Sequence, residues 1–273
     1  MRSLGEVMVV ASLEGAVLDK HGRMPRANAE VIRLFCARGG RFTVASDRTP
    51  AYVSAVVKDI PLTEPVICSG GATLFDVAES VCIAQKNLDG RAAVPVLESV
   101  QTTFPQIGII LQREDGILCA VRTSAPVHAY LRRENQVCLY SPIENVKQPW
   151  VRALLLGRPE QMDRVEQFAE RYRNNSEVQF TRLADDCFQL AAAGVSKGKA
   201  LQVLSQWSEV PQPDLYSIGG SHSDQQLLQM TGHSVAMPGS PVRVKLAAEL
   251  VTRLDTQEGG TAEFLYQLIK DYE

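Results

Sequence analysis

The sequence predicts an α/β protein: a Rossmann-like core with a mostly parallel sheet, interrupted by an inserted α+β domain. In the first third of the 273 residues, short apolar runs alternate with stretches of helical spacing. The same alternation returns in the last third, whereas the middle third contains a hairpin pattern. Because alternating strands and helices form parallel sheets with right-handed crossovers, we expect residues 1–82 and 187–273 to share one sheet. Residues 83–186 are expected to form the insertion.

The first third supplies three predicted strands and two predicted helices. Residues 7–11 are a short apolar run, which suits a strand buried on both faces. Helical spacing follows over residues 31–35, and Gly39-Gly40 can end that helix. The remaining expected elements are a strand at 42–45, a helix at 50–58 and a strand at 65–68.

The middle third is expected to be a separate unit. A hairpin across Asp115-Gly116 is predicted to join strands at 106–111 and 116–122. Further expected elements are helices at 125–134 and 159–173 and strands at 151–156, 178–183 and 187–191. In the last third we expect helices at 197–207, 224–230 and 242–250, with strands at 215–218 and 234–236.

The composition argues against several classes of protein. The formal net charge of -3 at pH 7 is unlike that of a general nucleic-acid binder, whose phosphate contacts need a basic surface. No apolar stretch approaches the roughly 18 residues that a membrane span needs, so no membrane association is expected. The six cysteines form no CxxC pair, which argues against a zinc site, and most lie in apolar runs. We therefore expect a cytoplasmic protein with reduced cysteines.

Polar residues follow the three strands predicted in the first third. The segments are Ser12-Leu13-Glu14-Gly15, Ser46-Asp47-Arg48 and Ser69-Gly70-Gly71. Parallel α/β sheets bind ligands at the carboxyl ends of their strands. These segments are therefore expected to line a site.

Five segments in order carry a resemblance to a known family. They are Ser12-Leu13-Glu14-Gly15-Ala16-Val17, Ser46-Asp47-Arg48, Gly70-Gly71-Ala72, residues 194–201 and residues 219–224. Their order and spacing resemble the Cof-type sugar-phosphate phosphatases of the haloacid dehalogenase superfamily, which have a class II, subtype B cap. The resemblance covers nearly the whole chain. It implies a haloacid-dehalogenase core at 1–82 and 187–273 and an α+β cap at 83–186.

The resemblance also implies which positions should do chemistry. In that family a first Asp attacks phosphorus, a second Asp is general acid and base, and magnesium shields the developing charge. Here Ser12 stands at the nucleophile position, Glu14 at the acid/base position, and Gly220 at the position of a metal-binding Asp. Asp224 is the carboxylate that remains in the fourth motif, so magnesium is expected to bind weakly or not at all. His222 is a possible replacement ligand, although a lone histidine is more often structural.

The phosphate-holding positions of the family are retained. Ser46 and Lys197 match the residues that hold phosphoryl oxygens, and Arg48 lies beside Ser46 in the sequence. Such a positive, hydrogen-bonding pocket suits a phosphate or a carboxylate. A serine mechanism in which Glu14 activates Ser12 is the less favoured interpretation, because a serine nucleophile needs a base or a metal to activate it.

Three functions follow from these substitutions. The favoured one is a catalytically impaired relative of sugar-phosphate phosphatases that still binds a phosphorylated small molecule. The second is an active, magnesium-dependent phosphatase with a divergent site. The third is a non-catalytic structural or interaction protein.

Overall fold

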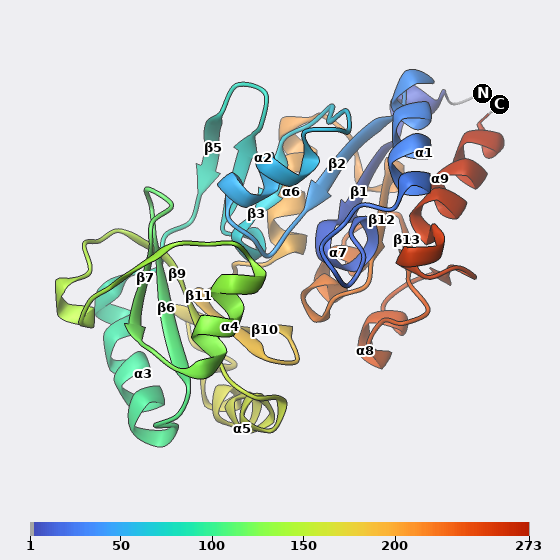
Figure 1. Cartoon of the computed structure of the whole chain (residues 1–273). Helices are drawn as coiled ribbons and strands as arrows, with labels where there is room; N and C mark the ends of the chain where they lie inside the picture. The colour runs from blue at the N-terminus through green and yellow to red at the C-terminus, as the bar shows by residue number, and fades with distance from the viewer. Residues whose placement is uncertain (1–2, 273) are drawn as a thin grey trace. The chain divides into compact units, whose positions relative to one another are not determined.

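The computed structural model describes residues 3–272, and the chain divides into two compact units (Figure 1). Residues up to 84 and from 196 onward form the core unit, and residues 85–195 form the insert. Each unit has its own sheet and its own apolar clusters. The predicted α/β fold with a mostly parallel sheet and an α+β insertion is confirmed.

The core sheet has the strand order β14-β13-β12-β1-β2-β3-β4-β5. Its strands are β1 (Met8–Ser12), β2 (Arg41–Ala45), β3 (Val66–Cys68), β4 (Thr73–Asp76), β5 (Val81–Gln85), β12 (Leu215–Gly219), β13 (His233–Ala236) and β14 (Leu250–Val251). The pairings from β14 across to β3 are parallel, and β4 returns antiparallel to β3. In the register of the central strands, Ser12 pairs with Ala45 and Ala11 pairs with Ile218. The carboxyl ends of β1, β2 and β12 therefore lie at one edge.

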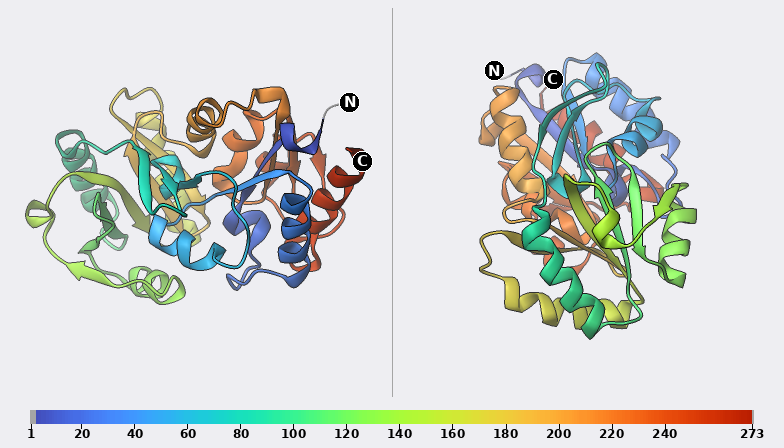
Figure 2. Two further views of the ribbon diagram at one scale, coloured as in Figure 1. Left: turned by 90° about the horizontal axis from the view of Figure 1, so that it is seen from above. Right: turned by 90° about the vertical axis from the view of Figure 1, so that its left-hand side faces the viewer.

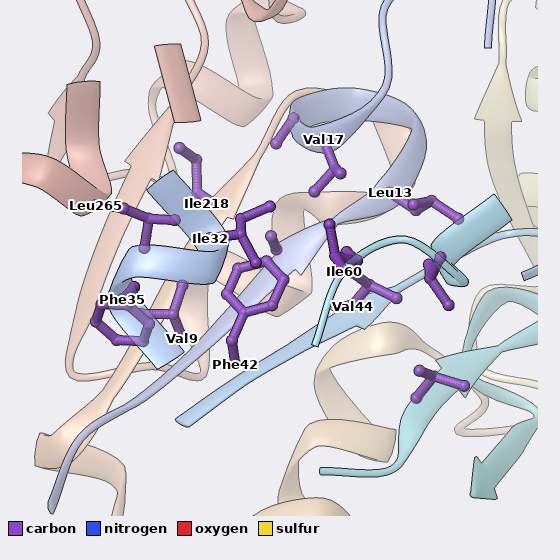
Figure 3. Packing of buried hydrophobic residues seen from close by; sticks show 14 of the residues in the cluster. Val9, Leu13, Val17, Ile32, Phe35, Phe42, Val44, Ile60, Ile218 and Leu265 are labelled. Atoms are coloured by element: carbon purple, nitrogen blue, oxygen red, sulfur yellow. The ribbon is translucent and has the colours of Figure 1, made fainter. Parts of the chain in front are cut away.

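Helices cover both faces of the core sheet. They are α1 (Arg26–Ala37), α2 (Pro50–Val57), α6 (Lys197–Trp207), α7 (Gln225–Gln229), α8 (Val242–Lys245) and α9 (Gly260–Asp271). Val9 of β1 belongs to the apolar cluster that includes Phe35 of α1 and Leu265 of α9 (Figure 3). Met8 and Val10 belong to the cluster formed with α6 and α7. Burial on both faces explains why β1 is a continuous apolar run.

The first and last helices of the core pack against each other. α1 and α9 lie side by side in Figure 1 and in the left view of Figure 2. Thr261 at the start of α9 also donates a hydrogen bond of 2.7 Å from Oγ1 to the carbonyl oxygen of Ala16. The C-terminal helix thus holds the loop that follows β1, which is one of the loops expected to line the site.

The insert is built on a six-stranded sheet in the order β10-β11-β9-β6-β7-β8. Its strands are β6 (Gly108–Arg113), β7 (Leu118–Arg122), β8 (Cys138–Tyr140), β9 (Trp150–Leu156), β10 (Val178–Ala184) and β11 (Cys187–Ala192). Its helices are α3 (Gly90–Thr103), α4 (Ala125–Arg133) and α5 (Pro159–Ala169). The sheet is antiparallel except for the parallel pair of β7 and β8.

Some predicted boundaries differ from the structure. β11 pairs with β9 and β10, so residues 187–195 belong to the insert, and the sequence-based limit of 83–186 ends too early. The predicted helix at 242–250 is only the short α8, followed by the edge strand β14. The sequence interpretation also lacked α3 and α9; α3 carries Pro95 in its interior, which disfavours a helix. Among residues 3–272, no helix combines the length and the apolar character needed to cross a bilayer.

Candidate active site

Two loops at the carboxyl edge of the core sheet carry the first two motifs. Ser12 ends β1, and the next residues, Leu13–Val17, form a π-helical turn that carries Glu14. The segment Ser46-Asp47-Arg48 follows β2 directly, and its first N–H donates to the carbonyl oxygen of Ile67 in β3 at 2.8 Å. This hydrogen bond fixes the start of the second loop beside the end of β3.

Two further elements deliver the later motifs to the same edge. Lys197 is the first residue of α6, whose N-cap Ser196 accepts a hydrogen bond from the Lys199 N–H at 3.2 Å. Such a cap satisfies a helix donor that would otherwise lack a partner. Asp224 ends a short 3-10 turn that follows β12. The cap and the turn therefore place one cation and one carboxylate at the strand ends.

A buried ion cluster links the second, third and fourth motifs. The Lys197 ammonium Nζ lies 2.8 Å from Asp224 Oδ1 and 3.3 Å from Asp47 Oδ2. The exposed fractions of these side chains are 0% for Lys197, 0% for Asp224 and 5% for Asp47. Ser223 donates a further hydrogen bond of 2.7 Å from Oγ to Asp47 Oδ2. The lysine is thus balanced by two carboxylates of the chain itself.

A second set of contacts surrounds the carboxylate of Glu14. Ser46 Oγ donates to Glu14 Oε1, and the Asp47 N–H donates to Glu14 Oε2 at 3.3 Å. The guanidinium Nε of Arg48 lies 3.9 Å from Oε1. We call the Ser46 hydroxyl, the Asp47 N–H and the Arg48 guanidinium the anion cradle. In the structure this cradle holds the carboxylate of Glu14.

Ser12 is brought to the sheet edge but makes no contact of the kind that activates a nucleophile. Its side chain is 0% exposed, and its Oγ has no hydrogen-bond partner among residues 3–272. A serine hydroxyl attacks only when a base or a metal ion removes its proton. The carboxylate nearest in sequence, Glu14, is instead bonded to the anion cradle.

The loops that follow β1 and β12 pack backbone against backbone at Gly15 and Gly220. A Cβ added to Gly220 would lie 2.1 Å from the carbonyl oxygen of Gly15. A Cβ added to Gly15 would lie 2.6 Å from the N atom of Ser221 and 2.9 Å from Asp224 Oδ2. Separations under 3.0 Å to backbone atoms require the backbone to shift. Position 220 therefore has no space for an aspartate side chain unless the loops move apart.

The carboxylate of Asp224, which remains in the fourth motif, is already engaged by hydrogen-bond donors of the protein. Asp224 Oδ1 accepts from Lys197, while its Oδ2 accepts from the N–H groups of Gly220 at 2.9 Å and Ser221 at 2.7 Å. Both oxygens therefore face protein donors, whereas magnesium needs carboxylate or phosphate oxygens as ligands. Among residues 3–272, His222 and its neighbours form no group of three or more His, Cys, Asp or Glu side chains suited to a metal ion.

The charges of the cluster shift the pKa values of its members. Burial would lower the pKa of Lys197, but Asp224, Asp47 and Glu14 raise it above its ordinary value. Burial would raise the pKa of Asp224, but Lys197 and two backbone N–H donors hold it below its ordinary value of 3.8. Burial raises the pKa of Glu14, and Lys197 and Arg48 offset only part of that effect. The lysine is therefore protonated at neutral pH.

The lowered pKa of Asp224 predicts a loss of stability in acid. A carboxylate whose pKa is lower in the folded state stabilises the protein above its unfolded-state pKa and loses that effect as the pH falls through the folded one. The wild type should therefore lose stability below about pH 3.8, and Asp224→Asn should lose less over the same range. Urea unfolding of both proteins between pH 7 and pH 2 measures the difference. Parallel pH curves for the two would contradict this assignment.

Asp47 is the member of the site that sequence reasoning missed. It lies between Ser46 and Arg48 in the second of the five segments, and no role was predicted for it. In the structure its carboxylate contacts Lys197, and its Oδ1 is buried without a hydrogen-bond partner among the described residues. A charged residue between two residues predicted to hold phosphate is the sequence signal that could have identified it.

The structure connects most of the residues selected from the sequence. Glu14, Ser46 and Arg48 meet at the anion cradle, and Lys197 and Asp224 meet in the ion cluster next to it. Asp47 joins the two sets through its N–H and its carboxylate. Ser12 lies at the same edge without a hydrogen bond to either set. The catalytic, phosphate-binding and metal-binding roles of these residues stay predictions.

Comparisons with known proteins agree with this fold. Residues 9–265 of this chain match the haloacid dehalogenase-like hydrolase family. The 5-amino-6-(5-phospho-D-ribitylamino)uracil phosphatase YwtE of Bacillus subtilis is 23% identical over an alignment 290 positions long. The alignment covers 96% of this chain and 97% of YwtE. The structure of SMU.1108c from Streptococcus mutans superposes with a TM-score of 0.85 at 17% identity, covering 96% of this chain and 98% of the other.

A sugar phosphatase of known structure has the same fold. BT4131, described as a sugar phosphatase of haloacid dehalogenase subclass IIB, superposes with a TM-score of 0.82 at 17% identity. The match covers 96% of this chain and 98% of BT4131. With the family match over residues 9–265, the chain belongs to the haloacid dehalogenase-like hydrolases and is of the Cof type.

Proposed function

We propose that the core unit binds a phosphorylated small molecule at the anion cradle and that its magnesium-dependent phosphoryl transfer is impaired. The main support for ligand binding is that the Ser46 hydroxyl, the Asp47 N–H and the Arg48 guanidinium converge on one anionic group, the carboxylate of Glu14. Donors of this kind hold phosphate as readily as carboxylate. The relatives named as phosphatases support a phosphate ester as the ligand class.

The residue at the nucleophile position supports the proposal that phosphoryl transfer is impaired. The Ser12 hydroxyl has no hydrogen-bond partner within residues 3–272, and Gly220 contributes no carboxylate. Magnesium would therefore bind weakly or not at all, because hard cations need oxygen ligands that these positions no longer supply. The chain's own residues are left to orient an anion: Ser46 and the Asp47 N–H donate to it, and Arg48 supplies positive charge.

Calorimetric titration with inorganic phosphate, glucose 6-phosphate and glucose tests the proposal. We expect the two phosphates to bind and glucose not to bind, with and without magnesium. Arg48→Met should weaken phosphate binding about tenfold or more, because hydrogen bonds and ion contacts to charged groups are worth ~1.5–3 kcal/mol. The matched control is Arg26→Met, since Arg26 is an exposed arginine of α1 in the same unit.

The titration also separates the alternatives. Binding that requires magnesium and is followed by release of phosphate would favour the active, divergent phosphatase. No heat with any phosphate ester, in the wild type or in variants of the cradle, would favour the non-catalytic structural protein. Binding unaffected by Arg48→Met would place the ligand elsewhere in the molecule.

A further inference from the structure

The anion cradle is already filled by a side chain of the same unit. Glu14 accepts from the Ser46 hydroxyl through Oε1 and from the Asp47 N–H through Oε2 at 3.3 Å. Its side chain is only 17% exposed. Glutamate has one methylene more than the aspartate of the family motif, and that added length carries the carboxylate farther from the backbone of the turn.

A phosphate and the Glu14 carboxylate need the same donors. Ser46 has one O–H and Asp47 has one backbone N–H, and both are engaged by Glu14. A phosphate oxygen that accepts these hydrogen bonds must therefore displace the Glu14 oxygens. Occupation by Glu14 and occupation by a ligand exclude each other.

Charge adds a second barrier to an incoming anion. Among the charged groups joined by these contacts, the carboxylates of Glu14, Asp47 and Asp224 outnumber the cations of Lys197 and Arg48. The excess is negative. The side chains of Lys197, Asp47 and Asp224 are almost excluded from solvent, and those of Glu14 and Arg48 are mostly buried, so Coulomb interactions among them are weakly screened. A phosphate that enters beside Glu14 would increase that excess, whereas one that replaces it in the cradle would face less repulsion.

We propose that Glu14 is an internal competitor that occupies the phosphate position of the core, so that an anionic ligand binds only after this side chain leaves the cradle. The inference rests on the proposed phosphate-binding function. It makes Glu14 the residue that sets the threshold for ligand binding, in place of the proton-transfer role that its position implies in the family.

The release needs only side-chain rotation. The turn at Leu13–Val17 is fixed by the hydrogen bond of 2.8 Å from the Leu18 N–H to the Leu13 carbonyl oxygen, and Gly15 is fixed by its contact with the loop after β12. The Glu14 side chain is held by the cradle contacts and is partly open to solvent. Turning its torsions therefore empties the cradle without moving the backbone.

Three substitutions distinguish two explanations for weak phosphate binding: occupation of the anion cradle by Glu14, and electrostatic repulsion by nearby carboxylates. Glu14→Ala removes both the carboxylate and its reach. Glu14→Asp keeps the charge and shortens the reach, so it should free the cradle while leaving the net charge unchanged. Asp47→Asn removes a neighbouring carboxylate but leaves Glu14 and the Asp47 N–H in place. The probe is inorganic phosphate, titrated calorimetrically into each protein without magnesium, with circular dichroism as a check that each variant is folded.

The expected result is a dissociation constant for phosphate that falls about tenfold or more in Glu14→Ala and Glu14→Asp, with a smaller change in Asp47→Asn. Equal affinities in the wild type, Glu14→Ala and Glu14→Asp would overturn the inference while leaving the proposed function intact. A gain in Glu14→Ala and Asp47→Asn but not in Glu14→Asp would also overturn it, because charge alone would then explain the effect. If neither the wild type nor the variants bind phosphate, the proposed function and the inference both fail.

Discussion

Replacement of Lys197 by methionine is expected to lower the free energy of unfolding by about 3–5 kcal/mol. The substitution removes the cation that lies 2.8 Å from Asp224 and 3.3 Å from Asp47, and both carboxylates stay buried. A buried charge that loses its partner keeps its desolvation cost without compensation. Urea unfolding at pH 7 measures the change.

Two further variants make this result specific. Lys199→Met changes an exposed lysine of the same helix and should alter the unfolding free energy by about 0.5 kcal/mol or less. Combining Lys197→Met with Asp47→Asn and Asp224→Asn should recover part of the loss, since replacing all charged members of a buried ion cluster costs less than removing one. A Lys197→Met protein as stable as the Lys199→Met protein would show that the ion cluster is not needed for the fold.

Wild-type turnover of aryl and sugar phosphates is expected to be on the order of a million-fold below that of a relative with an intact first motif. The estimate is the cost of removing a covalent nucleophile from another hydrolase. In this chain Ser12 lacks a base, and Glu14 is engaged with Ser46 and the Asp47 N–H. Phosphate release from p-nitrophenyl phosphate and glucose 6-phosphate, with magnesium present, measures the rate.

Ser12→Ala is the diagnostic variant for this second prediction. Because Ser12 is not expected to act as the nucleophile, the variant should leave the residual rate unchanged. Rapid wild-type turnover that Ser12→Ala abolishes would establish the serine mechanism. Rapid turnover that survives Ser12→Ala would mean that another residue is the nucleophile. Either result would contradict an impaired site.

The sequence was sufficient to predict the strands and helices that are specified by the pattern of neighbouring residues. Apolar runs predicted the central strands, and the polar residues after them predicted that the loops at Ser12, Ser46 and Ser69 would share one edge, because parallel strands end together. The place of Asp224 was implied by motif order. The boundary of the insert was wrong because β11 is an apolar run that would suit either sheet. Its partner depends on pairings between distant segments, which periodicity does not encode.

Which side chains of the site contact each other depends on where each side chain points, and the spacing of motifs along the sequence does not give that direction. Motif order placed Glu14 and Ser46 near each other but assigned the first to proton transfer and the second to phosphate. That Glu14 bonds to Ser46 follows from its length and from the turn on which it lies. Asp47 was missed for the same reason: its charge is visible in the sequence, but its contact with Lys197 is visible only in three dimensions.

The contact of Gly15 with Gly220 bears on how the site can evolve. An aspartate at 220 would need space that the carbonyl oxygen of Gly15 now fills, so Gly220→Asp alone would damage folding before it could add a metal ligand. A lineage with this loop arrangement must first separate the two loops, a step that confers no catalytic benefit on its own. The contact thus makes gain of a carboxylate at position 220 a change of at least two steps, and selection for phosphatase activity from this scaffold should begin with the length of the loop after β12 before changes at Ser12.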